Sequence, residues 1–278
     1  MPTVQTNGIQ TYYEEYGEGP PIVFLHGAPG DHRLWAEQAR PLASEYRIIV
    51  YDLRGNGRTG GSEIPSYTME LYADDLDALI AALDLDRPAI CGLSMGGMVA
   101  QTYAAKFTEN IAALCTLGAE TPEILTHGEW FERRILPKLI ERLAPIVGGD
   151  RLFSALDWIY EQRYGEETIG DLEKAEQIQQ AHAEEYPEIS ETEFEKIEDM
   201  LTSYPAMSVD YASITIPSLL MYGERERKVA ARHAKYMVSV IPDAEDRQIP
   251  NAGHNSHVDN PEFIVETLRE FLTTALGC

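Results

Sequence analysis

The sequence predicts an α/β fold in which a mostly parallel sheet carries helices on both faces. Short apolar runs alternate along the chain with longer segments whose apolar residues recur at helical spacing. Continuous apolar runs of this kind are typical of strands that are buried on both faces. After an initial hairpin, strands are predicted at residues 21–25, 47–51, 88–91, 111–117, 216–222 and 247–249.

The remaining elements follow from turn signals and periodicity. Residues 4–16 alternate in part and contain Asn7-Gly8, which favours a type I′ turn, so we expect an antiparallel hairpin. Glycine-rich segments come directly after several strands, and the carboxyl ends of parallel strands are where such sheets place their sites. Helices are predicted at residues 33–44, 69–83, 98–106, 230–240 and 261–276.

The alternation stops after the sixth predicted strand. Residues 121–205 show no buried-strand pattern and instead offer helical segments at 130–143, 151–164 and 172–185. We therefore expect a helical cap inserted into a core that is formed by residues 1–120 and 206–278. The apolar residues of the cap are expected to pack on the core or to line a pocket: Leu136, Leu139, Ile140, Leu143, Phe153, Leu156 and Trp158.

The charge of the chain restricts its partners. Its 22 Lys and Arg residues against 46 Asp and Glu residues give a net charge of -24 over 278 residues. Nucleic acids and anionic membranes are disfavoured as partners, because binding phosphate requires a basic surface. Self-repulsion on this scale is screened by molar salt, which suggests a halophilic source. The alternative is an ordinary acidic cytosolic enzyme.

Targeting and metal signals are not found in the sequence. No run of about 18 apolar residues predicts a membrane span, and residues 1–7 lack the features of a secretory signal, so we expect a cytoplasmic protein. Cys91, Cys115 and Cys278 form no paired framework and no metal-ligand spacing. His254 and His257 have no neighbouring ligand set, so no metal is expected.

A Gly-x-Ser-x-Gly motif spans residues 92–96, between an apolar run and a helix-forming segment. A strand-turn-helix of this kind exposes the central Ser94 in a strained conformation at a helix N-terminus, where developing negative charge is favoured. A serine hydroxyl is a poor nucleophile unless a base lies within hydrogen-bond reach. His254 follows the last predicted strand and fits the chain order serine, acid, histidine.

The chain resembles α/β-hydrolases of the cap-bearing esterase and lactonase type over essentially its whole length. The resemblance implies the α/β-hydrolase fold, with a helical cap after the sixth strand. It is carried by five segments in family order: His26-Gly27-Ala28-Pro29-Gly30, Asp52-x-Arg54-Gly55-x-Gly57-Arg58, Gly92-x-Ser94-Met95-Gly96-Gly97, Gly223-x-x-Glu226 and Gly253-His254.

The resemblance implies roles for individual residues. Ser94 is expected to be the nucleophile and His254 the general base and then the general acid. The backbone N–H groups of Ala28 and Met95 are expected to form the oxyanion hole. The family usually has Asp where this chain has Glu226, and Glu120 stands at a position where some relatives carry the acid. We favour Glu226 as the acid, with Glu120 as the alternative. No cofactor is implied.

We expect hydrolysis of a small carboxylic ester or lactone through an acyl-enzyme. Three alternatives remain open. The His-Gly-Ala-Pro-Gly segment is similar to that of aminopeptidases acting on N-terminal proline, and hydrolases of carbon–carbon bonds use the same triad. A ligand-binding receptor on this scaffold is the third. Ser94 at the elbow, where epoxide-opening and dehalogenating relatives carry Asp, favours acyl transfer to water. Neither the acyl and leaving groups nor the oligomeric state follow from the sequence.

Overall fold

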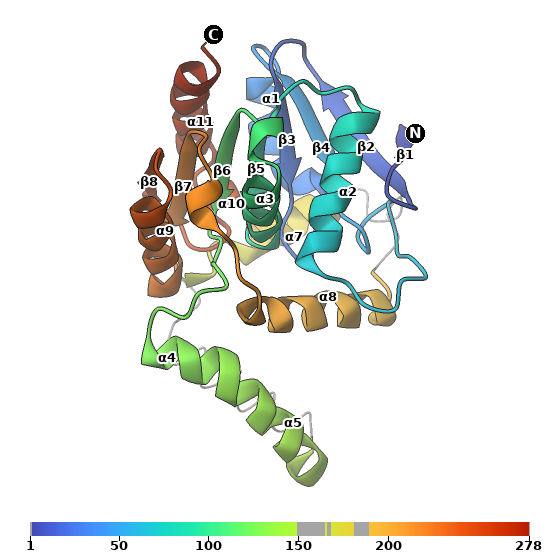
Figure 1. The fold of residues 1–278 in the computed structure, drawn as a ribbon, viewed down its shortest axis with the longest axis vertical. Coiled ribbons are helices and arrows are strands. Elements are labelled where there is room, and N and C mark those ends of the chain that lie inside the picture. Colours follow the sequence, from blue (N-terminus) through green and yellow to red (C-terminus); the bar gives the residue numbers. More distant parts are fainter. Residues whose placement is uncertain (1, 149–164, 166–167, 181–188, 278) are drawn as a thin grey trace.

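The computed structural model describes residues 2–148, 165, 168–180 and 189–277, and it is built around one eight-stranded sheet (Figure 1). Strand order is β1-β2-β4-β3-β5-β6-β7-β8. The first two strands are antiparallel additions, and all pairings from β4 to β8 are parallel. The predicted α/β class is therefore confirmed. The strands are β1 (Thr3–Gln5), β2 (Gln10–Tyr16), β3 (Pro21–Leu25), β4 (Arg47–Tyr51), β5 (Ala89–Leu93), β6 (Ala113–Leu117), β7 (Ser218–Gly223) and β8 (Ala244–Ile249).

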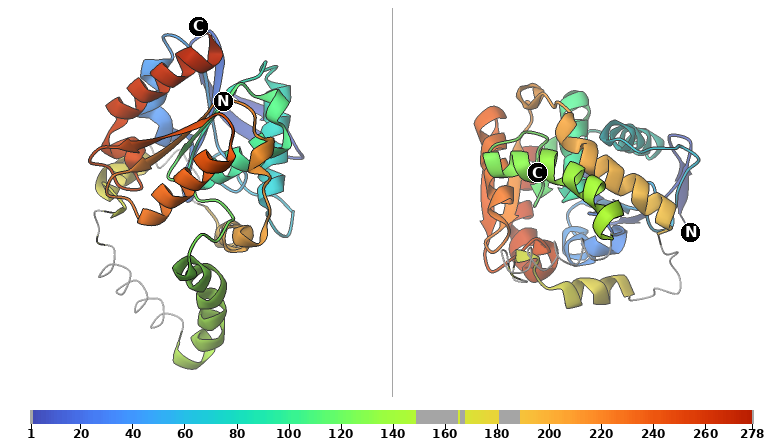
Figure 2. Two further views of the ribbon diagram at one scale, coloured as in Figure 1. Left: turned by 60° about the vertical axis from the view of Figure 1, so that its left-hand side comes forward. Right: turned by 90° about the horizontal axis from the view of Figure 1, so that it is seen from below.

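Helices cover both faces of this sheet (Figure 2). One core contains α2 (Met69–Ala82), α3 (Met95–Lys106) and α9 (Lys228–Val240), and the other contains α1 (Ala36–Leu42) and α11 (Pro261–Leu276). Successive strand residues point to opposite cores: in β3, Val23 and Leu25 face the first, whereas Ile22 and Phe24 face the second. The apolar strand runs exist because both faces of the sheet are buried.

Local signals fix the helix ends. The side chain of Thr68 accepts a hydrogen bond from the N–H of Leu71 and so caps α2. Helix α11 begins at Pro261 after Asn260, whose side chain caps it, and ends at Leu276, before the left-handed Gly277. Its bounds are those that the sequence predicts.

The predicted hairpin is present, but its turn is not the two-residue type I′ turn that Asn7-Gly8 favours. The strand register pairs Gln5 with Gln10, so four residues form the loop. Only Gly8, with φ of 76°, has a positive φ among them, and the N–H of Thr6 donates to Ile9 O at 3.0 Å. The longer loop removes the need for a left-handed Asn7.

The described residues between β6 and β7 contain helices and loops but no strand, as predicted. They form α4 (His127–Trp130), a π-helical turn (Phe131–Ile135), α5 (Leu136–Val147), α7 (Leu172–Gln180) and α8 (Glu191–Ser203). Helix α8 lies across one end of the sheet, whereas α4 and α5 extend away from it (Figures 1 and 2). The exact division into core and cap remains a prediction.

The expectation that the apolar residues of the cap pack on the core is wrong for those of α5. Leu139 is 42% exposed, and Leu136, Ile140 and Leu143 are only half-buried. The physical reason is the direction of α5, which extends away from the core instead of lying on it (Figure 1). Phe153, Leu156 and Trp158 lie outside the described residues, as do the predicted helix 151–164 and the end of the predicted helix 172–185. Within the described part of the chain, no helix has the length and apolarity that crossing a membrane requires.

Candidate active site

Ser94 occupies a sharp turn between β5 and α3. Its backbone lies at φ 50° and ψ -117°, a region that residues with a side chain rarely adopt. Two flanking glycines permit the turn. A Cβ on Gly92 would lie 2.3 Å from Gly96 O, and a Cβ on Gly96 would lie 2.4 Å from Leu25 O. The Gly-x-Ser-x-Gly spacing is therefore a steric requirement of this turn.

The structure brings Ser94, His254 and Glu226 into one chain of hydrogen bonds. Ser94 Oγ lies 3.0 Å from His254 Nε2, and His254 Nδ1 lies 2.6 Å from Glu226 Oε1. An ionised carboxylate only accepts, so Nδ1 carries the proton and Nε2 accepts from the serine hydroxyl. This tautomer is the one in which imidazole can remove a proton from serine.

Glu226 is held in place by the turn that follows β7. Its second oxygen, Oε2, accepts from the N–H of Gly223 at 3.0 Å, and its side chain is only 4% exposed. One carboxylate oxygen is thus fixed by the backbone while the other meets the imidazole. The extra methylene of glutamate is accommodated by this local turn.

The loop that carries His254 is tied to the segment between β6 and β7. The N–H of His254 donates to Thr168 O at 2.9 Å, and the N–H of Asn255 donates to Ile169 O at 2.7 Å. Burial lowers the pKa of the His254 imidazole, but the hydrogen bond and charge of Glu226 outweigh burial, so the pKa lies above its ordinary value. These carbonyl partners have no signature in the sequence, because any residue supplies a backbone oxygen.

Glu120 does not contact His254 Nδ1. It follows β6, and its carboxylate lies 3.9 Å from Arg133 Nε, in a side chain that is 24% exposed. Burial raises the pKa of the Glu120 carboxyl, against the opposing charges of Arg133 and Arg227. Arg133 also donates to the carbonyls of Thr121 and Glu123, both at 2.9 Å. Glu120 is therefore a second carboxyl near the imidazole, and it is paired with Arg133 of the π-helical turn.

The two expected oxyanion donors lie on segments next to Ser94. Gly27, which precedes Ala28, packs so closely that an added Cβ would lie 3.3 Å from Ser94 Cβ. Met95 is the first residue of α3, and N–H groups in the first turn of a helix lack an intrahelical acceptor. Their neighbour His26 braces this loop, since its Nε2 accepts from the N–H of Leu53 at 3.0 Å.

One buried group in the described chain has the ligand atoms of a metal site: Asp31, His32 and Asp52. Its polar atoms are already used by the protein. His32 Nδ1 lies 2.6 Å from Asp52 Oδ1, and Arg33 Nη2 lies 2.6 Å from Asp31 Oδ2. Although burial lowers it, hydrogen bonds to Asp52 and Glu14 raise the pKa of His32 to about 9. The hydrogen bonds and ion pairs among these residues thus give their polar atoms partners within the protein.

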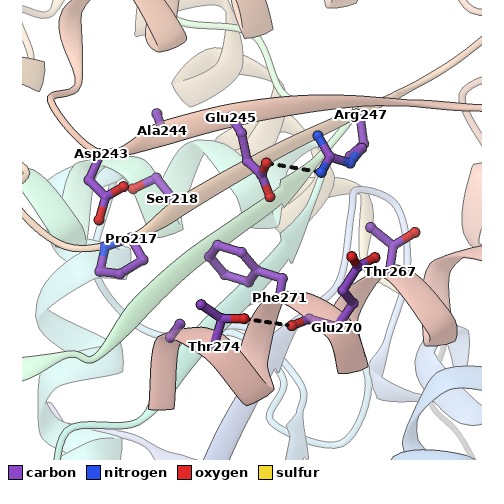
Figure 3. A pocket seen from close by; sticks show the side chains of 11 residues that line it. Pro217, Ser218, Asp243, Ala244, Glu245, Arg247, Thr267, Glu270, Phe271 and Thr274 are labelled. Atoms are coloured by element: carbon purple, nitrogen blue, oxygen red, sulfur yellow. Dashed lines mark hydrogen bonds and ion pairs between the residues drawn. The ribbon is translucent and has the colours of Figure 1, made fainter. Parts of the chain in front are cut away.

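Two cavities differ in their relation to Ser94. A cavity of about 530 Å³ lies between α11 and the amino ends of β7 and β8, where Glu245 pairs with Arg247 at 3.0 Å (Figure 3). Ser94 follows the carboxyl end of β5, at the opposite edge of the parallel sheet, so this cavity is unrelated to it. A second cavity, of about 630 Å³, lies beside Glu226 and is lined by charged residues of α4 and α9.

Comparisons with known proteins identify the family of the chain. A family model described as the alpha/beta hydrolase fold matches residues 20–261. The chain is 26% identical over 286 residues to proline iminopeptidase PfmaB of Pestalotiopsis fici, which covers 97% of this chain and 98% of that protein. It is 25% identical over 275 residues to 3-oxoadipate enol-lactonase 1 of Acinetobacter baylyi, a match that covers 97% of this chain and 92% of that protein. A solved esterase from Thermogutta terrifontis matches with a TM-score of 0.65 and 26% identity, over 98% of each chain. The chain belongs to the α/β-hydrolase family.

Proposed function

We propose that this hydrolase cleaves a carboxylic ester or lactone through an acyl-enzyme. The observation that carries the proposal is the hydrogen-bonded chain from Ser94 Oγ through the His254 imidazole to Glu226. A strained, half-exposed serine next to a correctly protonated imidazole is the arrangement that nucleophilic catalysis requires. The enol-lactonase and esterase relatives support a small-molecule substrate of this chemical class.

In the first half of the reaction, Ser94 Oγ attacks the carbonyl carbon while its proton passes to His254 Nε2. The resulting imidazolium is stabilised by Glu226, which lies 2.6 Å from Nδ1. We assign the stabilisation of the negative charge on the carbonyl oxygen to the N–H groups of Ala28 and Met95. The imidazolium then protonates the departing alkoxide, and the acyl group remains on Ser94.

In the second half, His254 Nε2 accepts a proton from water, and the hydroxide oxygen attacks the acyl carbon. The bond to Ser94 Oγ breaks, and the serine recovers its proton from the imidazolium. Electrons and protons balance without a cofactor, because water is the only co-reactant. In a lactone, the alkoxide that leaves in the first half stays attached to the acyl group.

Intact mass after treatment with a fluorophosphonate tests the proposal. One covalent adduct on the wild-type protein that is missing from Ser94→Ala is expected, since only an activated serine reacts with this probe. Ester and lactone panels would then define the substrate. A folded wild-type protein without an adduct would reject the serine mechanism and favour a receptor that binds its ligand without turnover.

Proline aminopeptidase activity is the second candidate. The iminopeptidase relative and the carboxyl of Glu120 near His254 favour it, because a carboxylate can bind the α-ammonium group of a peptide. Hydrolysis of prolyl-naphthylamide well above that of naphthyl esters would support this reaction. A strong preference for the esters would reject it.

A further inference from the structure

Four polar side chains from segments next to the catalytic loop are buried in the protein interior. Trp35 ends the 3₁₀ turn η1 (His32–Trp35), and Gln38 lies in α1. Ser256 and His257 begin α10 (Ser256–Asp259), which starts two residues after His254. The exposure of Trp35, Gln38 and Ser256 is 0% and that of His257 is 1%. Polar side chains buried this completely require hydrogen-bond partners.

These side chains have polar atoms without a protein partner. Within the described chain, Trp35 Nε1, Gln38 Oε1, Ser256 Oγ and both ring nitrogens of His257 accept and donate no hydrogen bond. Three of the residues are joined by contacts, and the fourth, Ser256, directly precedes His257 in the chain. Gln38 Nε2 donates to the backbone oxygen of His257 at 2.7 Å, and the rings of Trp35 and His257 have centroids 6.1 Å apart. We call these four residues the buried polar cluster.

The protonation of His257 defines what the buried polar cluster can bind. Burial lowers the pKa of His257 to about 3, and the nearby charges of His254 and Lys174 act in the same direction. The imidazole is therefore neutral at physiological pH, with one N–H donor and one acceptor nitrogen. Trp35 adds a donor, Gln38 an acceptor and Ser256 a group that does both. The ligand must therefore both donate and accept hydrogen bonds.

We propose that the buried polar cluster binds internal water and that this water positions the loop carrying His254. Water is the smallest molecule that donates and accepts, and buried water typically makes two to four hydrogen bonds to such groups. A metal ion fits less well, because the cluster offers one imidazole and neutral oxygens but no carboxylate.

The position of the cluster connects it to catalysis. The bond from Gln38 to His257 O joins α1 to α10, and α10 directly follows the loop whose imidazole meets Ser94. On its other side, this loop is held through Thr168 and Ile169. Water that joins α10 to Trp35 and Gln38 would complete the support of the loop from the core. This positioning role rests on the proposed function, whereas the water site does not.

The first test is independent of activity. A high-resolution crystal structure and water-proton or oxygen-17 relaxation dispersion are measured on the wild-type protein and on His257→Phe. We expect ordered water within about 3.2 Å of at least two cluster atoms, and fewer long-lived waters in the variant. No ordered water at the cluster would overturn the proposal, as would an unchanged count in a folded variant.

Two further variants keep this test decisive. Tyr51→Phe removes another buried hydroxyl without a protein partner, from the opposite core, and should leave the ordered water at the buried polar cluster unchanged. Ser256→Ala is a smaller change for use where His257→Phe does not fold, and it should remove or shift the water peak next to Ser256 Oγ. If the water peak stays in place in Ser256→Ala, the assignment of this water to Ser256 is contradicted.

The second test addresses positioning. In His257→Phe, kcat for an ester should fall roughly 10- to 100-fold with KM nearly unchanged, because the imidazole is misplaced. The NMR signal of the His254 Nδ1 proton should move as well, whereas Tyr51→Phe changes neither. Loss of the water with unaltered kcat and an unaltered signal would overturn the positioning role. A wild-type protein without esterase activity would reject the proposed function, while the water count would still decide the site.

Discussion

Gly118 packs its backbone directly against His254. A Cβ at this position would lie 3.0 Å from His254 Nδ1 and 2.8 Å from Glu226 Oε1, and the φ of Gly118 is 57°. The residue after β6 therefore borders the hydrogen bond between the imidazole and its acid. Sequence reasoning did not select Gly118, although a glycine directly after a strand at the active edge is a usable signal.

Gly118→Ala should impair catalysis more than stability. The added methyl group would push His254 and Glu226 apart, so kcat should fall roughly 10- to 100-fold, while the positive φ costs about 1 kcal/mol of stability. Gly8→Ala is the matched control, since Gly8 also has a positive φ but an added Cβ meets nothing within 4 Å. Equal kcat in both variants would contradict the steric role of Gly118.

Removing the charge of Glu226 should abolish most activity. Glu226→Gln keeps the size of the side chain but loses the acceptor that fixes the imidazole tautomer, and kcat should drop by up to about 10⁴-fold. Glu120→Gln should lower it less than about tenfold, because Glu120 does not contact Nδ1. Steady-state kinetics on one ester measures both. The reverse order of effects would transfer the role of the acid to Glu120.

The acid side of the pH–rate profile should report His254. The imidazole acts as a base only when neutral, so kcat/KM falls as pH decreases through its pKa. Since Glu226 raises that pKa, the fall should be centred above the ordinary value of about 6.5. In Glu226→Gln, the residual activity should titrate at lower pH, because the charge that favours the imidazolium is gone. If the acid side of the profile does not shift in Glu226→Gln, the pairing of Glu226 with His254 is contradicted.

Stability should decrease at alkaline pH because of His32. Its pKa of about 9 in the folded protein exceeds the unfolded value, so its contribution is complete below about pH 6.5 and lost as pH rises through 9. The difference corresponds to about 3 kcal/mol. His254 has the same sign, so the comparison is between wild type and His32→Gln, whose unfolding free energy should depend less on pH from 6.5 to 9. The unfolding free energies are measured by urea unfolding at several pH values. The same pH dependence in both proteins would refute the prediction.

Sequence and structure agree most closely where a pattern has one physical solution. The short apolar run at 21–25 is typical of a strand that is buried on both faces of a sheet, and Pro261 and Gly277 mark both ends of α11. An amphipathic stripe, in contrast, specifies a face but not its packing partner, which is why the predicted packing of Leu139 on the core is wrong. Contacts between distant segments, such as Gln38 with His257, have no local pattern from which to infer them.

The choice between the two candidate acids shows the same limit of sequence patterns. Glu120 and Glu226 follow the neighbouring strands β6 and β7, so strand order alone places both near the imidazole. The two candidates differ in the turn after β7. There, the N–H of Gly223 donates to Glu226 Oε2, and this bond directs the other carboxylate oxygen to His254 Nδ1. Spacing therefore predicts two candidates, and side-chain geometry is needed to distinguish them.

Salt should stabilise this protein if it comes from a halophile. A net charge of -24 imposes self-repulsion that is strong at low ionic strength. At 1 M KCl the Debye length is about 3 Å, so most repulsion between surface carboxylates is screened. The melting temperature should rise continuously from 10 mM to molar KCl, by several degrees or more. Sucrose at equal osmolality is the control, because it strengthens apolar burial without screening charge. A melting temperature that is flat in KCl would reject the halophilic hypothesis and leave an ordinary acidic enzyme.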